Sequence, residues 1–187
     1  RIIHENGSRA ERPFMALACA ALPASLAEVE LFGHARGAYT GAGDASEGIL
    51  ESTEGGTLYL ANADDLDIET QALFLRVLES GEYRRVGENE TRRADVRVIV
   101  GTRGALDQLV VAGGFREDLY FRLKGVTLRL PVLADRPEDL PLLLERIMKE
   151  EAPKLNLTPR ARKALLLRPW PGNLLELRNE VRRLATL

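Results

Sequence analysis

The stretch GGTLYLANADDL, residues 55–66, joins a Gly-Gly turn to a short apolar run. A continuous apolar run after turn residues is typical of a strand buried in a parallel sheet. In folds that hydrolyse nucleotides, such strands end in carboxylates that hold Mg²⁺ and orient the attacking water. Here the run ends at Ala61 and Asn62, so the sequence predicts the strand without the acids that this position often carries.

Strand patterns alternate with helical patterns on both sides of this stretch. Apolar and β-branched runs predict strands at 13–19, 56–61, 95–102 and 126–133. Helical spacing of apolar residues predicts helices at 25–32, 67–80 and 104–111. Gly81 is a natural stop for the helix at 67–80, and Pro131 weakens the last strand. Strands that alternate with helices indicate an α/β fold with a parallel sheet.

The pattern changes after Leu133. From Asp135 onward only helical spacing occurs, with predicted helices at 138–150, 159–167 and 173–187. Thr158 and Asn173 are predicted N-caps of the last two helices. The sequence therefore predicts an α/β domain over 1–133 and a small all-helical domain over 134–187.

The composition restricts the class of protein. Of 187 residues, 45% are hydrophobic and 29% are charged, which favours a packed core over disorder. A net charge of −2 argues against nucleic-acid binding by bulk electrostatics. Cys19 is the single cysteine, so no intrachain disulfide is possible, and a buried, unreactive thiol in a reducing compartment such as the cytoplasm is expected. No apolar stretch has the length of a membrane span.

Residues 30–42 read ELFGHARGAYTGA, in which glycines and small residues surround one aromatic, Tyr39. Glycines let the backbone turn sharply, and an aromatic at the tip offers a large contact area with few rotatable bonds. The stretch is typical of a protein-contact loop, with an ordinary surface loop as the alternative. His34 is interpreted as a solvated loop residue, because two histidines in the chain make a metal site a poor explanation.

Further motifs follow this loop in a fixed order: GGTLYL at 55–60, QALFLRVLESGEYRRVG at 71–87, DVRVIVGT at 95–102, FREDLYFRLKGVTLRLPVL at 115–133, RPEDLPLLL at 136–144 and WPGNLLEL at 170–177. Together with the loop, they resemble the sigma-54-dependent transcription activators, a bacterial branch of the AAA+ ATPases. The resemblance extends over essentially the whole chain.

The resemblance implies a P-loop-type parallel sheet with flanking helices and an all-helical lid. It also implies ATP with Mg²⁺ as cofactor, self-association in a ring, and contact with the sigma-54 RNA polymerase holoenzyme. Promoter DNA is then reached only through a domain outside this chain. The resemblance assigns the polymerase contact to Gly37, Ala38, Tyr39, Thr40, Gly41 and Ala42.

The FREDLYFRL motif carries two arginines that the resemblance assigns as fingers acting on a neighbour's nucleotide, Arg116 and Arg122. A guanidinium suits this role because it is planar, permanently charged and able to bind phosphate oxygens bidentately. From spacing alone, the alternative is a surface arginine paired with Glu117 or Asp118.

The nucleotide site departs from the family pattern at several positions. Ala61 and Asn62 stand in place of the Asp that supports Mg²⁺ and the Glu that polarises water. The other departures are Ala18 for an Asn that switches the Glu, Arg103 for the sensor Asn, and Leu175 for the lid arginine. The Gly-rich phosphate loop is absent from these residues, and the family places it, with a first strand, just upstream of Arg1.

These observations predict a sigma-54 interaction domain of a bacterial transcription regulator that keeps its scaffold and contact loop while ATP hydrolysis is impaired or lost. Losing both metal support and water orientation removes most of what catalyses phosphoryl transfer. Two alternatives stay open at this point. One is a working ATPase activator that tolerates the changes, and the other is a non-enzymatic regulator or scaffold.

Overall fold

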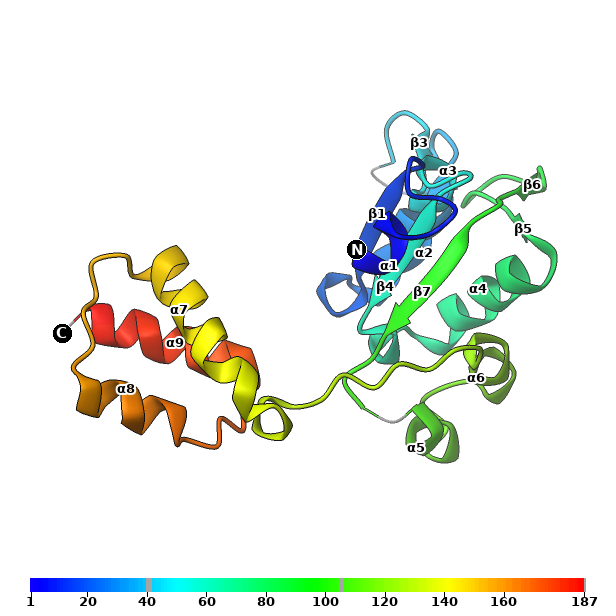
Figure 1. Cartoon of the computed structure of the whole chain (residues 1–187). Coiled ribbons are helices and arrows are strands. Elements are labelled where there is room, and N and C mark those ends of the chain that lie inside the picture. The colour runs from blue at the N-terminus through cyan, green and yellow to red at the C-terminus, as the bar shows by residue number, and fades with distance from the viewer. Residues whose placement is uncertain (40–41, 105, 187) are drawn as a thin grey trace. The chain divides into compact units, whose positions relative to one another are not determined.

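The computed structural model describes residues 1–39, 42–104 and 106–186. The chain forms two compact units, Arg1–Val126 and Thr127–Leu187. Each unit has its own hydrophobic core. The first contains a parallel sheet, whereas the described residues of the second form only helices and turns (Figure 1).

Three parallel strands form the sheet of the first unit: β1 (Phe14–Ala18), β4 (Thr57–Ala61) and β7 (Arg97–Gly101). Their order is β1-β4-β7, which confirms the predicted α/β fold with a parallel sheet. The register pairs Ala18 with Ala61 and Ala61 with Gly101. All three strands therefore end at the same edge of the sheet.

The described residues of this unit contain the helices α1 (Ile2–Glu5), α2 (Ala24–Phe32), α3 (Ile49–Ser52), α4 (Ile68–Ser80), α5 (Leu106–Val111) and α6 (Glu117–Leu123). Helices α2 and α4 supply fully buried aromatic and aliphatic side chains to the core. Phe32 and Phe74 belong to one buried cluster with Leu58 and Leu60 of β4. The apolar run of β4 is thus the centre of the core, as its sequence predicts.

The bounds of α4 follow from its two end residues. Asp67 caps the N-terminus, where its side chain accepts a hydrogen bond from the Thr70 backbone N–H at 2.8 Å. Gly81 ends the helix with a left-handed φ of 74°. The predicted stop at Gly81 is confirmed.

The second unit contains α7 (Leu140–Glu151), α8 (Pro159–Leu166) and α9 (Asn173–Ala185), preceded by short 3₁₀ turns at Leu133–Asp135 and Pro137–Asp139. Trp170 lies in the centre of its core, and its indole N–H donates to the Leu165 carbonyl at 2.9 Å. Thr158 caps α8 as predicted, since its hydroxyl accepts from the Ala161 N–H at 3.2 Å. None of the helices in the described ranges has both the length and the apolar character needed to cross a bilayer.

Two predicted features of these segments are wrong. Residues 126–132 are not a strand, and Val126 and Leu130 are 91% and 89% exposed. A period-2 pattern forms a strand only where a partner strand accepts its hydrogen bonds, and none of the described strands pairs with this segment. Asn173 is the first residue of α9 instead of its cap, and its Oδ1 accepts from the Leu133 N–H at 2.7 Å.

Four short strands also form two hairpins that the sequence pattern did not reveal: β2 (Gly33–His34) with β3 (Ser46–Glu47), and β5 (Glu82–Tyr83) with β6 (Arg92–Arg93). Two-residue strands are too short for a periodicity to be visible. The β2–β3 hairpin carries the predicted contact loop between its strands.

Candidate functional site

The carboxyl edge of the sheet brings together residues that are far apart in the sequence. Because β1 and β4 pair in register, Ala18 and Ala61 lie side by side at the strand ends. Asn62 follows Ala61, and Arg103 follows the end of β7 by two residues. The structure therefore brings these four residues, which the resemblance singles out, to one edge of the sheet.

Asn62 changes the direction of the chain at this edge. Its φ of 58° and ψ of 51° are left-handed, a conformation that asparagine tolerates better than most residues. The residue begins the 3₁₀ turn Ala63–Asp65, labelled η2. The two acids that follow the strand, Asp64 and Asp65, are therefore carried by a turn after the strand end.

Arg103 pairs with both of these acids. Its guanidinium forms an ion pair with Asp65, and its Nε lies 3.5 Å from Asp64 Oδ2. The Asp64 side chain is only 11% exposed, and its Oδ1 is buried without a hydrogen-bond partner among the described residues. The Arg103 side chain thus supplies positive charge beside the first two carboxylates that follow β4.

The donor set at this edge does not fit the Mg²⁺ and water chemistry of an ATPase. Ala61 has no ligand atom, and the Asn62 amide cannot accept a proton from water. The nearest carboxylates are already paired with Arg103. Within the described ranges, no group of three or more His, Cys, Asp or Glu side chains is arranged to hold a metal ion.

Cys19 lies directly after β1 at the same edge and is buried. Burial is the largest cause that raises its pKa to about 11, and the nearby negative charges of Asp65 and Asp64 act in the same direction. The thiol therefore stays protonated at neutral pH. This agrees with the predicted unreactive, buried cysteine.

The predicted contact loop extends from the β2–β3 hairpin. Tyr39 is 43% exposed. The Ala42 N–H donates to the Tyr39 carbonyl at 2.9 Å. Gly37 has a left-handed φ of 70°. Thr40 and Gly41, also assigned to the contact, lie outside the described residues.

His34 is buried, so its interpretation as a solvated loop residue is wrong. Its Nδ1 lies 3.0 Å from the Ala35 carbonyl oxygen, and its ring meets the Tyr39 ring edge-on at a centroid distance of 5.4 Å. It also forms a bridge with Val86, a contact across 52 positions that no local pattern reveals. His34 is therefore part of the loop's packing.

Both candidate finger arginines are held within their own chain. The Arg116 guanidinium binds Asp118 bidentately at 3.0 and 2.7 Å, which raises the pKa of Arg116 and lowers the pKa of Asp118 through the same hydrogen bonds. Arg122 donates from Nε and Nη2 to the Leu78 carbonyl at 3.1 and 2.7 Å. Each guanidinium has to leave these partners before it can bind a phosphate.

Gln71 positions the first of these arginines, a role that the sequence did not indicate. The side chain is fully buried on α4, and its amide donates to the carbonyls of Leu66 and Gly114 at 2.8 and 3.2 Å. Its Oε1 accepts from the Arg116 backbone N–H at 2.8 Å. The sequence signal that could have indicated this role is a glutamine among the apolar positions of the predicted helix, because a buried polar side chain needs hydrogen-bond partners.

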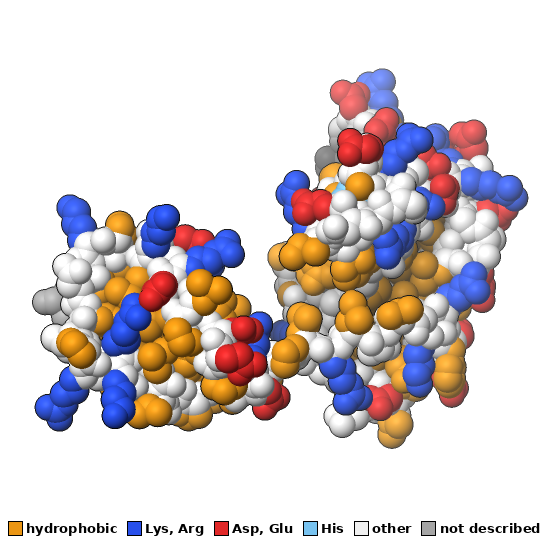
Figure 2. Space-filling model, viewed as in Figure 1, with side chains coloured by type: hydrophobic (Ala, Val, Ile, Leu, Met, Phe, Trp, Pro, Cys, Tyr) orange, Lys and Arg blue, Asp and Glu red, His pale blue; other side chains and the backbone are white. Residues whose placement is uncertain are grey.

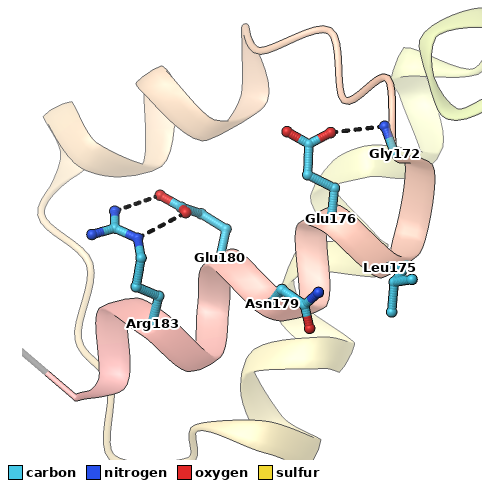
Figure 3. Close-up of a pocket in the computed structure, with 6 residues that line it drawn as sticks. All are labelled: Gly172, Leu175, Glu176, Asn179, Glu180 and Arg183. Carbon is cyan, nitrogen blue, oxygen red and sulfur yellow. Dashed lines mark hydrogen bonds and ion pairs between the residues drawn. The ribbon is translucent and has the colours of Figure 1, made fainter.

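Leu175 lies on α9 of the second unit and is 68% exposed. It contributes to a pocket of about 350 Å³ together with Gly172, Glu176, Asn179, Glu180 and Arg183 (Figure 3). Glu176 accepts from the Gly172 N–H at 2.8 Å, and Glu180 pairs with Arg183 at 2.7 Å. At position 175 the helix therefore presents an apolar side chain where the resemblance places a phosphate-binding arginine.

Comparison with family models assigns both parts of the chain. Residues 1–129 match the sigma-54 interaction domain, and residues 134–187 match the AAA+ ATPase lid domain. The chain belongs to the sigma-54 interaction domain family. The predicted resemblance is confirmed over the AAA+ α/β part and the lid.

Curated relatives of this sigma-54 interaction domain are bacterial transcriptional regulators. The chain is 46% identical over 191 residues to the DNA-binding transcriptional regulator NtrC of Rhizobium meliloti (strain 1021), covering 100% of the chain and 40% of the relative. It is 46% identical over 188 residues to the transcriptional regulatory protein XylR of Pseudomonas putida, covering 98% of the chain and 33% of the relative. The chain thus spans well under half of these relatives.

A solved structure of NtrX from Brucella abortus matches the domain with a TM-score of 0.90 and 40% identity, covering 98% of this chain and 42% of that one. NtrX structures in complex with ADP and ATP match with TM-scores of 0.87 and 0.86. A closed-state structure of Hsp104, at 16% identity and a TM-score of 0.66 over 97% of this chain and 36% of that one, shares the fold alone.

Proposed function

We propose that this chain is the AAA+ domain through which a transcription regulator contacts the sigma-54 RNA polymerase holoenzyme, and that its own ATP hydrolysis is lost or strongly impaired. The contact is assigned to Gly37, Ala38, Tyr39, Thr40, Gly41 and Ala42. The family match and the exposed aromatic tip of the hairpin support this assignment.

One observation carries the impaired hydrolysis. The in-register strands β1 and β4 end in Ala18 and Ala61, and the acids that follow them are paired with Arg103. Phosphoryl transfer depends on positioned charges and a positioned nucleophile. An edge with two alanines and an internal ion pair provides neither.

Nucleotide binding is a separate question from hydrolysis. The matching NtrX structures contain ADP and ATP, and the scaffold here is closely similar. We infer that binding of a nucleotide without turnover is compatible with the family fold. Promoter DNA would be reached through a domain outside this chain, since the relatives are more than twice its length.

Self-association in a ring is part of the same proposal. Arg116 and Arg122 would act on a neighbouring copy's nucleotide only after their contacts with Asp118 and the Leu78 carbonyl break. These contacts are exposed hydrogen bonds, whose net contribution to stability is small. Release on assembly is therefore energetically feasible.

Phosphate release from ATP tests the hydrolysis proposal. We expect the purified protein with Mg²⁺ to release phosphate no faster than a protein-free blank. The rate of phosphate release by the Ala61→Asp/Asn62→Glu variant, with and without Arg103→Asn, shows how much of the ATP hydrolysis these substitutions restore. Brisk release by the unmodified protein that disappears in Arg116→Ala and Arg122→Ala would establish the working activator instead.

Binding to sigma-54 holoenzyme tests the contact proposal. Tyr39→Phe keeps the ring and should bind as the unmodified protein does. Tyr39→Ala removes the exposed ring and should weaken binding roughly tenfold or more, as for an aromatic anchor of an interface. Equal binding by both variants would show that the loop does not make the contact, and no binding by any form would favour a scaffold role.

A further inference from the structure

Positive charge is concentrated in one segment of the second unit. Residues 152–175 contain five lysines and arginines and no aspartate or glutamate. We call this stretch the basic segment, and its cations are Lys154, Arg160, Arg162, Lys163 and Arg168. Because the whole chain has a net charge of −2, this excess of positive charge is local. Figure 2 shows blue side chains without red ones beside them at the lower left of the second unit, where Figure 1 places α8.

Two of these five cations are neutralised inside the unit. Arg162 donates from Nη1 and Nη2 to Glu145 Oε1, both at 3.1 Å. Arg168 donates to Glu176 at 2.7 Å. The other three are exposed and form no ion pair with the described residues: Lys154, Arg160 and Lys163. These three cations are therefore available to an anion that comes from outside the unit.

Two of the available cations lie on one face of α8. Arg160 and Lys163 are three positions apart, a spacing that puts both side chains on the same side of a helix. Arg160 also stands in the first turn, where the helix dipole disfavours a positive side chain, and no acid accompanies it there. An external anion at this end would be stabilised by the arginine side chain and by the helix N-terminus together.

The residues around these cations fit phosphate groups better than a protein partner. Asn156 and Thr158 are exposed just before α8. Such side chains, together with Lys, Arg and helix N-termini, make the usual contacts to nucleic-acid phosphates. A protein interface has an apolar core. Over residues 143–166, all of which the structure describes, no large apolar side chain is exposed, so this surface lacks such a core.

We propose that the basic segment binds the phosphate backbone of duplex DNA without reading its base sequence. Duplex DNA carries one negative charge per about 1.7 Å of its axis, so neighbouring phosphates can meet Arg160 and Lys163 at once. Lys154, in the connection between α7 and α8, supplies a third contact. The proposal does not rest on the polymerase contact or on the state of ATP hydrolysis. Base-specific recognition is a separate property, which the proposed function assigns to a domain outside this chain.

Fluorescence anisotropy of a labelled DNA duplex tests this proposal with the complete chain of 187 residues. At low salt we expect a dissociation constant on the order of 10⁻⁵ M, which lies in the range of non-specific DNA binding. Each phosphate contact contributes about 0.9 to the slope of log Kd against log salt concentration, so three contacts predict a slope of about 3. Two duplexes of unrelated sequence should bind equally well.

Arg160→Gln and Lys163→Gln should each weaken binding to both duplexes about tenfold at low salt and lower the slope by about 1, because each removes one phosphate contact. Both side chains are exposed, so the urea midpoint from Trp170 fluorescence should not change. Arg146→Gln is the matched control. It removes the same charge from an exposed arginine of α7 that pairs with Glu150 at 2.8 Å, and it should leave the slope unchanged.

Leu167→Ser separates this contact from a protein interface. Leu167, at the end of α8, is 74% exposed and is the apolar anchor that a protein partner would use, so its loss should leave DNA binding unchanged. The proposal is wrong if the unmodified chain does not bind the duplex at low salt, or if Arg146→Gln lowers the slope as much as Lys163→Gln does. Tighter binding of poly-L-glutamate or of an RNA duplex than of the DNA duplex would also overturn it, because the ligand would then be an acidic protein or RNA.

Discussion

Arg103 shows how a single residue changes the charge at the carboxyl edge of the sheet. An asparagine at this place, as the resemblance expects, could only hydrogen-bond, whereas the guanidinium brings a full positive charge to Asp64 and Asp65. Without this guanidinium, the nearly buried Asp64 carboxylate would lie beside the Asp65 carboxylate with no positive charge to offset their repulsion. The arginine therefore stabilises the turn that follows β4.

Replacing Arg103 with alanine should lower the free energy of unfolding by about 0.5–1 kcal/mol, because the arginine is 62% exposed and solvent screens much of the pair. Urea denaturation at low salt measures the change. Adding Asp64→Asn to this variant should recover part of the loss by removing the carboxylate repulsion. Identical midpoints for the unmodified protein and Arg103→Ala would show that the pair is not stabilising.

Ionisation of Cys19 makes the free energy of unfolding depend on pH in a definite direction. Its pKa is about 11 in the folded state against 9.0 as the reference value, so between these pH values the folded state binds more protons than the unfolded state. This contribution to stability is fully present below pH 9 and is lost as the pH rises toward 11.

Cys19→Ala has no thiol to ionise, so its unfolding free energy should fall less steeply between pH 8.5 and about 10.5 than that of the unmodified protein. Urea titrations at several pH values give the slope of the unfolding free energy against pH for each protein. The other titrating groups are the same in both proteins, so they do not contribute to the difference between the slopes. Parallel slopes would mean that the thiol ionises as easily in the folded as in the unfolded state.

At the scale of elements, α4 connects the core of the sheet to the candidate finger. Its apolar face packs Phe74 and Val77 into the main cluster, and its fully buried Gln71 side chain holds the start of α6. The same helix thus buries apolar side chains in the core and orients the start of α6. The position of Arg116 depends on α4 as much as on its own helix.

Gln71→Met keeps the size of the side chain but removes its three hydrogen bonds, which leaves the Leu66 carbonyl and the Arg116 N–H without these partners. We expect a loss of about 2–3 kcal/mol in the free energy of unfolding. Glu79→Met, at an exposed position of the same helix, is the matched control and should be nearly neutral. A similar small effect from both changes would contradict the role of Gln71.

The whole molecule is built around two separate hydrophobic clusters. One surrounds β4 and α4, and the other surrounds Trp170 and the helices α7 to α9. Residues 126–132 between the regular elements of the two units are exposed. Because each unit has a buried core of its own, we expect each to respond to denaturant on its own.

Trp170 is the only tryptophan and is buried in the second unit, so its fluorescence reports that unit alone. Far-UV circular dichroism reports the helices of both. We expect the urea midpoints from the two signals to differ. Superimposable curves would show that the chain unfolds as one cooperative body.

Much of the fold could be predicted because its signals are local. The apolar run at 58–60, the helical spacing of 67–80 and the stop at Gly81 each depend on neighbours within a few positions. The strand predicted at 126–133 is wrong because its formation does not depend on local signals alone. Its alternating pattern predicts a strand, but a strand also needs a partner that no local pattern can supply.

By itself, the sequence determined the family, the parallel α/β architecture, the helical second unit and the missing carboxylates at Ala61 and Asn62, because these depend on residue type and short-range order. Only the tertiary structure decided that Arg103 pairs with Asp64 and Asp65, and that His34 is buried. These contacts join residues tens of positions apart, and their existence depends on which surfaces the packed chain brings together.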